Sequence, residues 1–281
     1  MSTPIRVLCS PDADDLFMFR ALMLGLIDAG PFEWDIDTRD TDALNRIASS
    51  DPPDVSAVSI GFYPHIADQW QLLPHGGSVG DGYGPVVISK EPMGLADLAG
   101  KRVAIPGETT TAWLVLRLIA PDVIPTVVPI TPYQAIFEAL DAGEVDAGLV
   151  IHEGRLTYPD LGFHRVVDIG EWWKQQTGLP LPLGGNVIRR ALGPERIAQA
   201  SEVMRQGIQH ALDNREESIA WLLSKGGALP DAERVSEYLD MYANAETIGY
   251  SDRAREGLIE LYKRAYAAGL LPKPVPVDFA P

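Results

Sequence analysis

The sequence holds one cysteine and no long apolar run. Because Cys9 is the single cysteine in 281 residues, an internal disulfide and any metal site built from several cysteines are excluded. No stretch approaches the roughly 18 consecutive apolar residues of a membrane-spanning helix. The first residues also lack a basic segment followed by an apolar one, which is the pattern of an export signal. We therefore expect a cytoplasmic protein without a membrane anchor.

Positive charge is scarce. The chain has 23 Lys and Arg against 39 Asp and Glu, which gives a formal net charge of −16. This charge repels nucleic-acid phosphates and anionic membranes, so we expect neither as a partner. The hydrophobic fraction of 46% and the charged fraction of 22% are typical of a folded globular protein. The expected partner is a small molecule, and the sequence leaves the oligomeric state open.

Short apolar strands alternate with helical patterns along most of the chain. The spacing predicts strands at Ile5–Ser10 and Val55–Ser59, and a second series of strands that includes Lys101–Ile105 and Val145–Ile151. Strand–helix repeats of this kind predict an α/β fold with parallel sheets covered by helices.

The pattern changes at residues 179–186, LPLPLGGN, after which the chain has the spacing of helices without strands. We predict two α/β lobes around a central cleft, one of them inserted in the other. The first lobe would comprise residues 1–90 and 186–281, and the inserted lobe residues 91–185.

Polar or turn-forming residues follow four of the predicted strands. Ligands bind beyond the carboxyl ends of strands in open α/β sheets, so these four segments should face one cleft between the lobes. The segments are Ser10–Asp15, Ser59–Tyr63, Gly107–Thr111 and His152–Glu153.

His152 directly follows an apolar strand. Its ordinary pKa lies near neutrality, so an imidazole there could act as a general base. The alternative is a histidine that only caps or packs against the loop. Leu156 occupies the position of the second histidine of a zinc-protease motif, so that motif is absent. The role of Glu153 is left open.

Three threonines follow Gly107 between a strand and a helix. Free amides at a helix N-terminus, together with hydroxyls such as those of Thr110 and Thr111, form an anion-binding site. The alternative is simple helix capping by one threonine. The segment lacks the Gly-Lys-Ser/Thr ending of a nucleotide-binding P-loop.

The glycine-rich stretch 76–85 resembles two catalytic motifs but lacks their context. Pro74 spoils the strand that a serine-hydrolase elbow requires, and no helix follows. The spaced glycines lead into a strand, so a dinucleotide fingerprint is also excluded. We expect a loop that faces the ligand, and no cofactor.

Asp12, Asp14 and Asp15 crowd the turn before the first helix. Carboxylates in the first turn complement the helix dipole, and this is the favoured interpretation. The alternative is a hydrogen bond from a ligand hydroxyl to one of them, such as Asp14. A divalent cation has little support, and we predict no metal site.

Several long motifs resemble the 1,4-dihydroxy-6-naphthoate synthase family of the futalosine route to menaquinone. They are IHEGRLTYPDLGFHRVVDIGEWWKQQTGLPLPLG (151–184), VAIPGETTTAWLVL (103–116), the glycine stretch ending in Gly84-Pro85, and the opening turn and helix ending in Phe17-Met18-Phe19. The resemblance implies a periplasmic-binding-protein-like fold (type II) and a lyase. This lyase would convert cyclic dehypoxanthinylfutalosine to 1,4-dihydroxy-6-naphthoate and release a three-carbon fragment.

The resemblance also implies roles for individual residues. The family's general base corresponds to His152. Its ligand contacts correspond to Ser59, Thr110, Thr111 and Ala112, and we add Asp14 and Gly84 as candidate substrate-binding residues.

The opening turn departs from the family, which usually has Ser-Pro-Cys-Pro-Asn-Asp-Thr-Phe where this chain has Ser-Pro-Asp-Ala-Asp-Asp-Leu-Phe (10–17). Additional carboxylates would disfavour an anionic substrate unless they are protonated or turned away. Two alternatives therefore stay open, a non-catalytic small-molecule binder and a divergent enzyme that acts on another small carboxylate.

Overall fold

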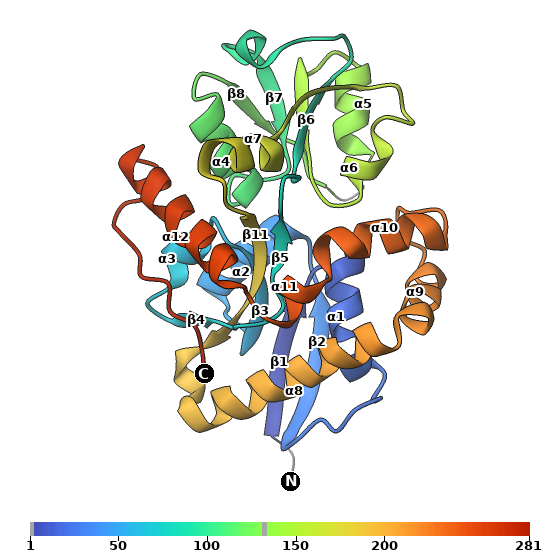
Figure 1. Ribbon diagram of the computed structural model, residues 1–281, viewed down its shortest axis with the longest axis vertical. Coiled ribbons are helices and arrows are strands. Elements are labelled where there is room, and N and C mark those ends of the chain that lie inside the picture. The colour runs from blue at the N-terminus through green and yellow to red at the C-terminus, as the bar shows by residue number, and fades with distance from the viewer. Residues whose placement is uncertain (1–2, 131–133) are drawn as a thin grey trace.

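The computed structural model describes residues 3–130 and 134–281, which form two mixed β-sheets with helices packed on them (Figure 1). The strands of the first sheet lie in the order β2 (Phe32–Thr38), β1 (Thr3–Cys9), β3 (Val55–Ser59), β11 (Leu181–Arg189) and β4 (Trp70–Leu72), and β5 (Ser78–Gly80) also pairs with β11. Those of the second sheet lie in the order β10 (His164–Asp168), β6 (Val86–Ser89), β9 (Ala147–Val150), β7 (Arg102–Ile105) and β8 (Ile124–Val127).

The sheets are only partly parallel. β1 runs parallel to β2 and β3, and β7 runs parallel to β8 and β9, as the strand–helix repeats predict. By contrast, β11 is antiparallel to β3, β4 and β5, and β6 is antiparallel to β9 and β10. The expectation of wholly parallel sheets is therefore wrong. The antiparallel strands include β6 and β11, the first strands that the chain forms after it crosses from one sheet to the other. They do not follow a strand–helix repeat within their own sheet, which is the pattern that produces parallel strands.

The proline-rich stretch 179–186 is largely a strand, which the sequence analysis missed. Strand β11 begins at Leu181 and lies between β3 and β4. Its pairing with β5 shifts register between Pro182 and Gly184. A proline has no amide to donate, and such a register irregularity is where a sheet tolerates one. Proline content therefore hid a strand at the centre of the sheet.

The sheets also differ from the predicted lobe boundaries by a few residues. β6 precedes residue 91 but belongs to the second sheet, and β11 begins before residue 186 but belongs to the first. The chain crosses between the sheets at residues 81–85 and 178–180. We propose these crossings as the lobe boundaries.

Helices cover both sheets (Figure 1). The C-terminal helices predicted from the sequence are present, and α1 packs against α8, α9 and α10 beside the first sheet. None of the helices in the described residues is long and apolar enough to cross a membrane. The helices are α1 (Ala13–Met23), α2 (Thr41–Ser50), α3 (Tyr63–Ile66), α4 (Thr111–Ile119), α5 (Ala135–Asp141), α6 (Gly154–Thr157), α7 (Ile169–Thr177), α8 (Pro194–Asp213), α9 (Arg215–Ser224), α10 (Ala232–Tyr242), α11 (Ala245–Ile248) and α12 (Asp252–Ala267).

One hydrophobic cluster joins the two lobes. It includes Val58 of the first sheet, Val103 of the second, Leu114 of α4 and Leu258 of α12. Burial of such side chains contributes about 1.5–3 kcal/mol each. The lobes are thus held together by apolar packing that involves α4 and α12. Helices α1, α2, α4 and α10 contribute side chains to a cavity between the lobes.

Candidate active site

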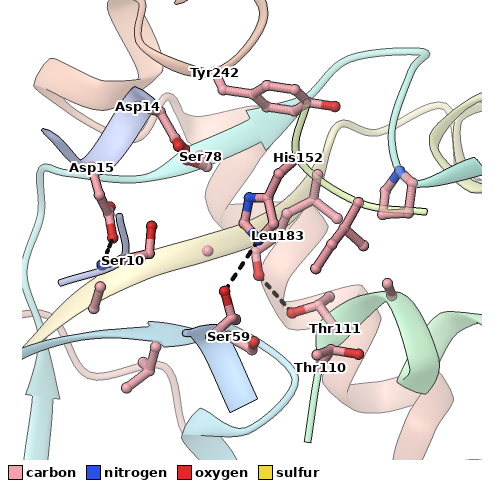
Figure 2. A pocket seen from close by; sticks show the side chains of 18 of the residues that line it. Ser10, Asp14, Asp15, Ser59, Ser78, Thr110, Thr111, His152, Leu183 and Tyr242 are labelled. Atoms are coloured by element: carbon pink, nitrogen blue, oxygen red, sulfur yellow. Dashed lines mark hydrogen bonds between the residues drawn. The ribbon is translucent and has the colours of Figure 1, made fainter. Parts of the chain in front are cut away.

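A cavity between the lobes collects the polar residues at the strand ends (Figure 2). The empty space between its walls, including its open mouth, is about 770 Å³, which is ample for a small organic molecule. Its apolar walls include Leu44, Val58, Ile151, Leu183 and Tyr242.

The seven residues predicted as catalytic or substrate-binding all line this cavity. The predicted convergence of four strand ends is therefore confirmed, because Ser10, Ser59, Thr110 and His152 follow or end four different strands and border the same space. This placement does not test the role of any one residue. The seven are Asp14, Ser59, Gly84, Thr110, Thr111, Ala112 and His152.

His152 has an unusual backbone conformation. Its φ angle is 50°, in the left-handed region, and among the described residues no other non-glycine residue has a positive φ. Such a conformation costs of order 1–3 kcal/mol and occurs preferentially at functional sites. The imidazole is held from both sides, with Nδ1 3.3 Å from Oδ2 of Asp12 and Nε2 3.1 Å from Oγ1 of Thr41.

Opposing effects act on the pKa of His152. Burial alone would lower it, but the nearby carboxylates of Asp12, Asp14, Glu153 and Asp15 together raise the pKa above its ordinary value. The same carboxylates would stabilise the imidazolium that forms when His152 accepts a proton from a ligand.

The acidic turn is less negative than its composition suggests. Burial, followed by the charge of Asp14, raises the pKa of Asp15 to about 7, and burial also raises the pKa of Asp14. Oδ2 of Asp15 accepts a hydrogen bond from the Ser10 amide (2.6 Å). Asp14 accepts hydrogen bonds from the hydroxyls of Ser78 (2.6 Å) and Tyr238 (3.1 Å). Protonation of Asp15 reduces the repulsion that this turn would exert on an anionic ligand.

Helix α4 presents backbone amides to the cavity. The hydroxyl of Thr110 accepts a hydrogen bond from the amide of Trp113, so Thr110 is the N-cap that the simpler interpretation predicted. The hydroxyl of Thr111 donates to the carbonyl of Leu183 (2.5 Å) and accepts from the amide of Gly61. The amides of Thr111 and Ala112 lie in the first turn, where a helix offers no internal acceptor. An anion would therefore be bound by these amides.

Asn45 and Asp42 of α2 brace this turn from the first lobe, which the sequence analysis missed. The Asn45 amide donates to Oγ of Ser59 (3.0 Å) and Oγ1 of Thr109 (2.9 Å), and Oγ1 of Thr109 also donates to Asp42 (2.6 Å). Nothing in the sequence distinguishes a polar helix residue that makes such contacts from a polar helix residue that faces solvent.

Arg155 also lines the cavity and was missed. Its guanidinium pairs with Asp168 and donates to the carbonyl of Gly84 (2.7 Å), which fixes the glycine stretch against α6. The carbonyl of Gly84 is thus engaged by the protein itself.

Two tyrosines of α10, Tyr238 and Tyr242, complete the cavity, and neither was predicted. They are four residues apart and therefore share one face of the helix. Their ring centroids are 5.1 Å apart. In the described residues, no group of three or more His, Cys, Asp or Glu side chains is arranged to hold a metal ion.

Comparisons with known proteins agree with this picture. The model of a family described as menaquinone biosynthesis matches residues 5–267. A 1,4-dihydroxy-6-naphthoate synthase of Streptomyces coelicolor is 36% identical over 95% of this chain and 95% of its own length. A second protein of that name, from Thermus thermophilus, is 36% identical over 97% of this chain and 98% of its own length.

Solved structures show the same fold. Protein AF1704 of Archaeoglobus fulgidus superposes with a TM-score of 0.88 at 41% identity, over 95% of this chain and 98% of its own. The alkanesulfonate-binding protein SsuA of Xanthomonas axonopodis pv. citri superposes with a TM-score of 0.74 at 17% identity, over 98% and 96% of the two chains. The fold is therefore α/β and periplasmic-binding-protein-like, with two sheets.

Proposed function

The chain belongs to the menaquinone biosynthesis family, and on that premise we propose that it is a lyase that forms 1,4-dihydroxy-6-naphthoate from cyclic dehypoxanthinylfutalosine. Two relatives that are similar over nearly the whole chain bear the name of the corresponding synthase. The cavity between the lobes is the proposed active site.

The observation that carries this proposal is the position of His152. The residue follows β9 in a conformation that costs free energy, borders the cavity, and is held at both ring nitrogens. A histidine with only a packing role gains nothing from that strain. In the proposed reaction, Nε2 of His152 removes a proton from the sugar-derived ring and the ring opens. A carbon–carbon bond then breaks, the three-carbon fragment leaves, and the aromatic product forms.

The opposite wall binds the anionic part of the substrate. The product that we propose is a carboxylate, and the amides of Thr111 and Ala112 are donors at a helix N-terminus, where negative charge is favoured. Ser59 is held by Asn45 and would orient the ligand between the two walls. Closure of the lobes over the ligand would exclude water during proton transfer.

A direct assay tests the proposal. Purified protein is incubated with cyclic dehypoxanthinylfutalosine, and 1,4-dihydroxy-6-naphthoate is followed by mass spectrometry. Formation of the naphthoate at a rate proportional to protein concentration supports the proposal. If no product forms but the substrate raises the melting temperature, the protein is a binder. If neither occurs, the enzyme acts on another substrate, and the proposal fails in both cases.

A further inference from the structure

We propose that Asp12 is a positioning residue that holds His152 in the tautomer with the proton on Nδ1 and the lone pair on Nε2. This inference rests on the proposed function, because it assigns the arrangement that makes His152 a base. It concerns the contact between the first turn of one lobe and the strand end of the other.

Asp12 occupies a helix N-cap position without using its side chain as a cap. It precedes α1 with extended φ and ψ angles of −72° and 156°, but its carboxylate makes no capping bond to the helix amides. Such a bond is worth about 1 kcal/mol at this position, so another contact must replace it. The carboxylate instead lies 3.3 Å from Nδ1 of His152, and Asp12 is only 3% exposed.

Glu153 takes over part of the capping from the other lobe. Its Oε1 accepts a hydrogen bond from the amide of Ala13, the first residue of α1, at 3.1 Å. Glu153 is likewise 3% exposed. A carboxylate close to a helix N-terminus is favoured by the helix dipole. Two adjacent residues of one lobe thus contact two adjacent residues of the other, His152 with Asp12 and Glu153 with Ala13. Because Glu153 binds the Ala13 amide, the Asp12 carboxylate can face the imidazole.

The geometry assigns the two ring nitrogens different tasks. An ionised carboxylate accepts hydrogen bonds and attracts positive charge, so the 3.3 Å approach of Asp12 Oδ2 favours a proton on Nδ1 over one on Nε2. Nε2 then carries the lone pair in the neutral ring, and it faces Oγ1 of Thr41, which lines the cavity. A neighbouring carboxylate that fixes the tautomer also stabilises the imidazolium formed when the base accepts a proton.

Other charged groups surround the imidazole and must be separated from Asp12 in any test. Asp14 and Asp15 belong to α1 and Glu153 is the next residue in the chain, and all three act on His152 in the same direction as Asp12. The hydroxyl of Thr41 is uncharged. The Asp12 carboxylate is in direct contact with the ring, with Oδ2 3.3 Å from Nδ1.

The first measurement uses the wild-type protein and needs no substrate. The protein is labelled with ¹⁵N-histidine, and the ring nitrogen shifts of its five histidines are recorded over a pH titration. The signal that disappears in His152→Asn identifies His152. Above its titration midpoint, we expect shifts of the form protonated at Nδ1. The form protonated at Nε2 would overturn the proposal.

The second measurement compares Asp12→Asn with Asp15→Asn, each of which removes one buried carboxylate from the same turn. We expect the titration midpoint of His152 to fall by about 1 pH unit or more in Asp12→Asn, and by less in Asp15→Asn. Equal changes in the two variants would show that general charge, and not the contact, acts on the ring. If Asp12→Asn does not fold, the tautomer of His152 in the wild-type protein still tests the proposal.

Kinetics complete the test. With the substrate proposed above, we expect Asp12→Asn to lower kcat by about 100-fold with little change in KM, and to move the acid limb of the pH profile to lower pH. An unchanged acid limb would contradict a positioning role even if kcat fell. Because the NMR result does not depend on turnover, an inactive wild-type protein would refute the proposed function without refuting the tautomer.

Discussion

The two lobes present the same local structure to the cavity, a strand that ends in a turn from which a helix begins, but with opposite chemistry. After β1, the turn Ser10–Asp15 carries three buried aspartates. After β7, the turn Gly107–Ala112 carries three threonines and Glu108, and the first turn of α4 itself has no acidic residue. The first helix N-terminus is occupied by the protein's own carboxylates, whereas the second keeps amides available to a ligand.

This difference separates two tasks that one site has to perform. A helix N-terminus attracts negative charge, and in α1 the attraction is satisfied internally by Asp14, Asp15 and the cross-lobe contact of Glu153. The carboxylates then act on the protonation of His152. In α4 the same attraction is available for a substrate anion. We therefore propose that the acidic turn controls the protonation of His152 and that the threonine turn binds the substrate anion.

The largest expected effect concerns proton transfer. His152→Asn removes the base but keeps a residue that tolerates a positive φ, so the fold should persist. We expect kcat to fall by about 10²–10⁴-fold, the usual contribution of general base catalysis. The control is His164→Asn, since His164 is exposed on β10. A kcat near that of the wild type, with an unchanged melting temperature, would remove His152 from the mechanism.

The next effect concerns anion binding. Ala112→Pro removes one amide donor in the first turn of α4, where proline is tolerated. Loss of a hydrogen bond to a charged group is worth about 1.5–3 kcal/mol, so we expect KM to rise about 10-fold or more. Ala112→Gly keeps the amide and is the matched control. Equal KM values for the two variants would place the anion elsewhere in the cavity.

The acidic turn should make stability depend on pH. The folded pKa of Asp15, about 7, lies above its ordinary value of 3.8, so the folded state holds the proton more tightly. Its contribution to stability is complete below about pH 4 and is lost as the pH rises toward and through 7. His152 also has a raised pKa and acts in the same direction between its ordinary value of 6.5 and its folded one.

We therefore expect the free energy of unfolding to decrease between pH 5 and pH 8. In Asp15→Asn this decrease should be smaller, by about 1 kcal/mol or more, when both proteins are unfolded in urea at the two pH values. Asp51→Asn, which changes an exposed carboxylate, should retain the decrease of the wild type. A pH dependence shared by all three proteins would mean that Asp15 titrates normally.

The smallest expected effect concerns the N-cap of α4. Thr110 caps α4 through its hydroxyl, so Thr110→Val should lower the free energy of unfolding by about 1 kcal/mol. Thr110→Ser keeps the hydroxyl and should lose much less. Thermal unfolding of the two variants measures the difference. Equal melting temperatures would show that the observed capping bond contributes nothing to stability.

Part of this arrangement could be predicted from the sequence. Apolar strands followed by polar residues identified His152, Ser59 and the threonine turn, because ligands of open α/β sheets bind beyond the carboxyl ends of the strands. The cavity was therefore predictable in outline.

The remaining features depend on contacts between distant segments. Strand β11 was hidden because Pro180 and Pro182 suggest a break, and only the neighbouring strands show that a register irregularity accommodates Pro182. The contact of Asp12 with His152 spans 140 positions, and the raised pKa of Asp15 requires burial that composition cannot reveal. From the sequence, the favoured interpretation was that the aspartates complement the dipole of the first helix. The structure shows that they also raise the pKa of His152.

A crystal structure of His152→Asn with bound cyclic dehypoxanthinylfutalosine tests the division of tasks most directly, since this variant should bind the substrate without converting it. The account predicts that an anionic oxygen of the substrate lies within hydrogen-bonding distance of the Thr111 and Ala112 amides, and that the sugar-derived ring lies against residue 152. A substrate anion placed against Asp14 and Asp15, or a ring distant from residue 152, would contradict it.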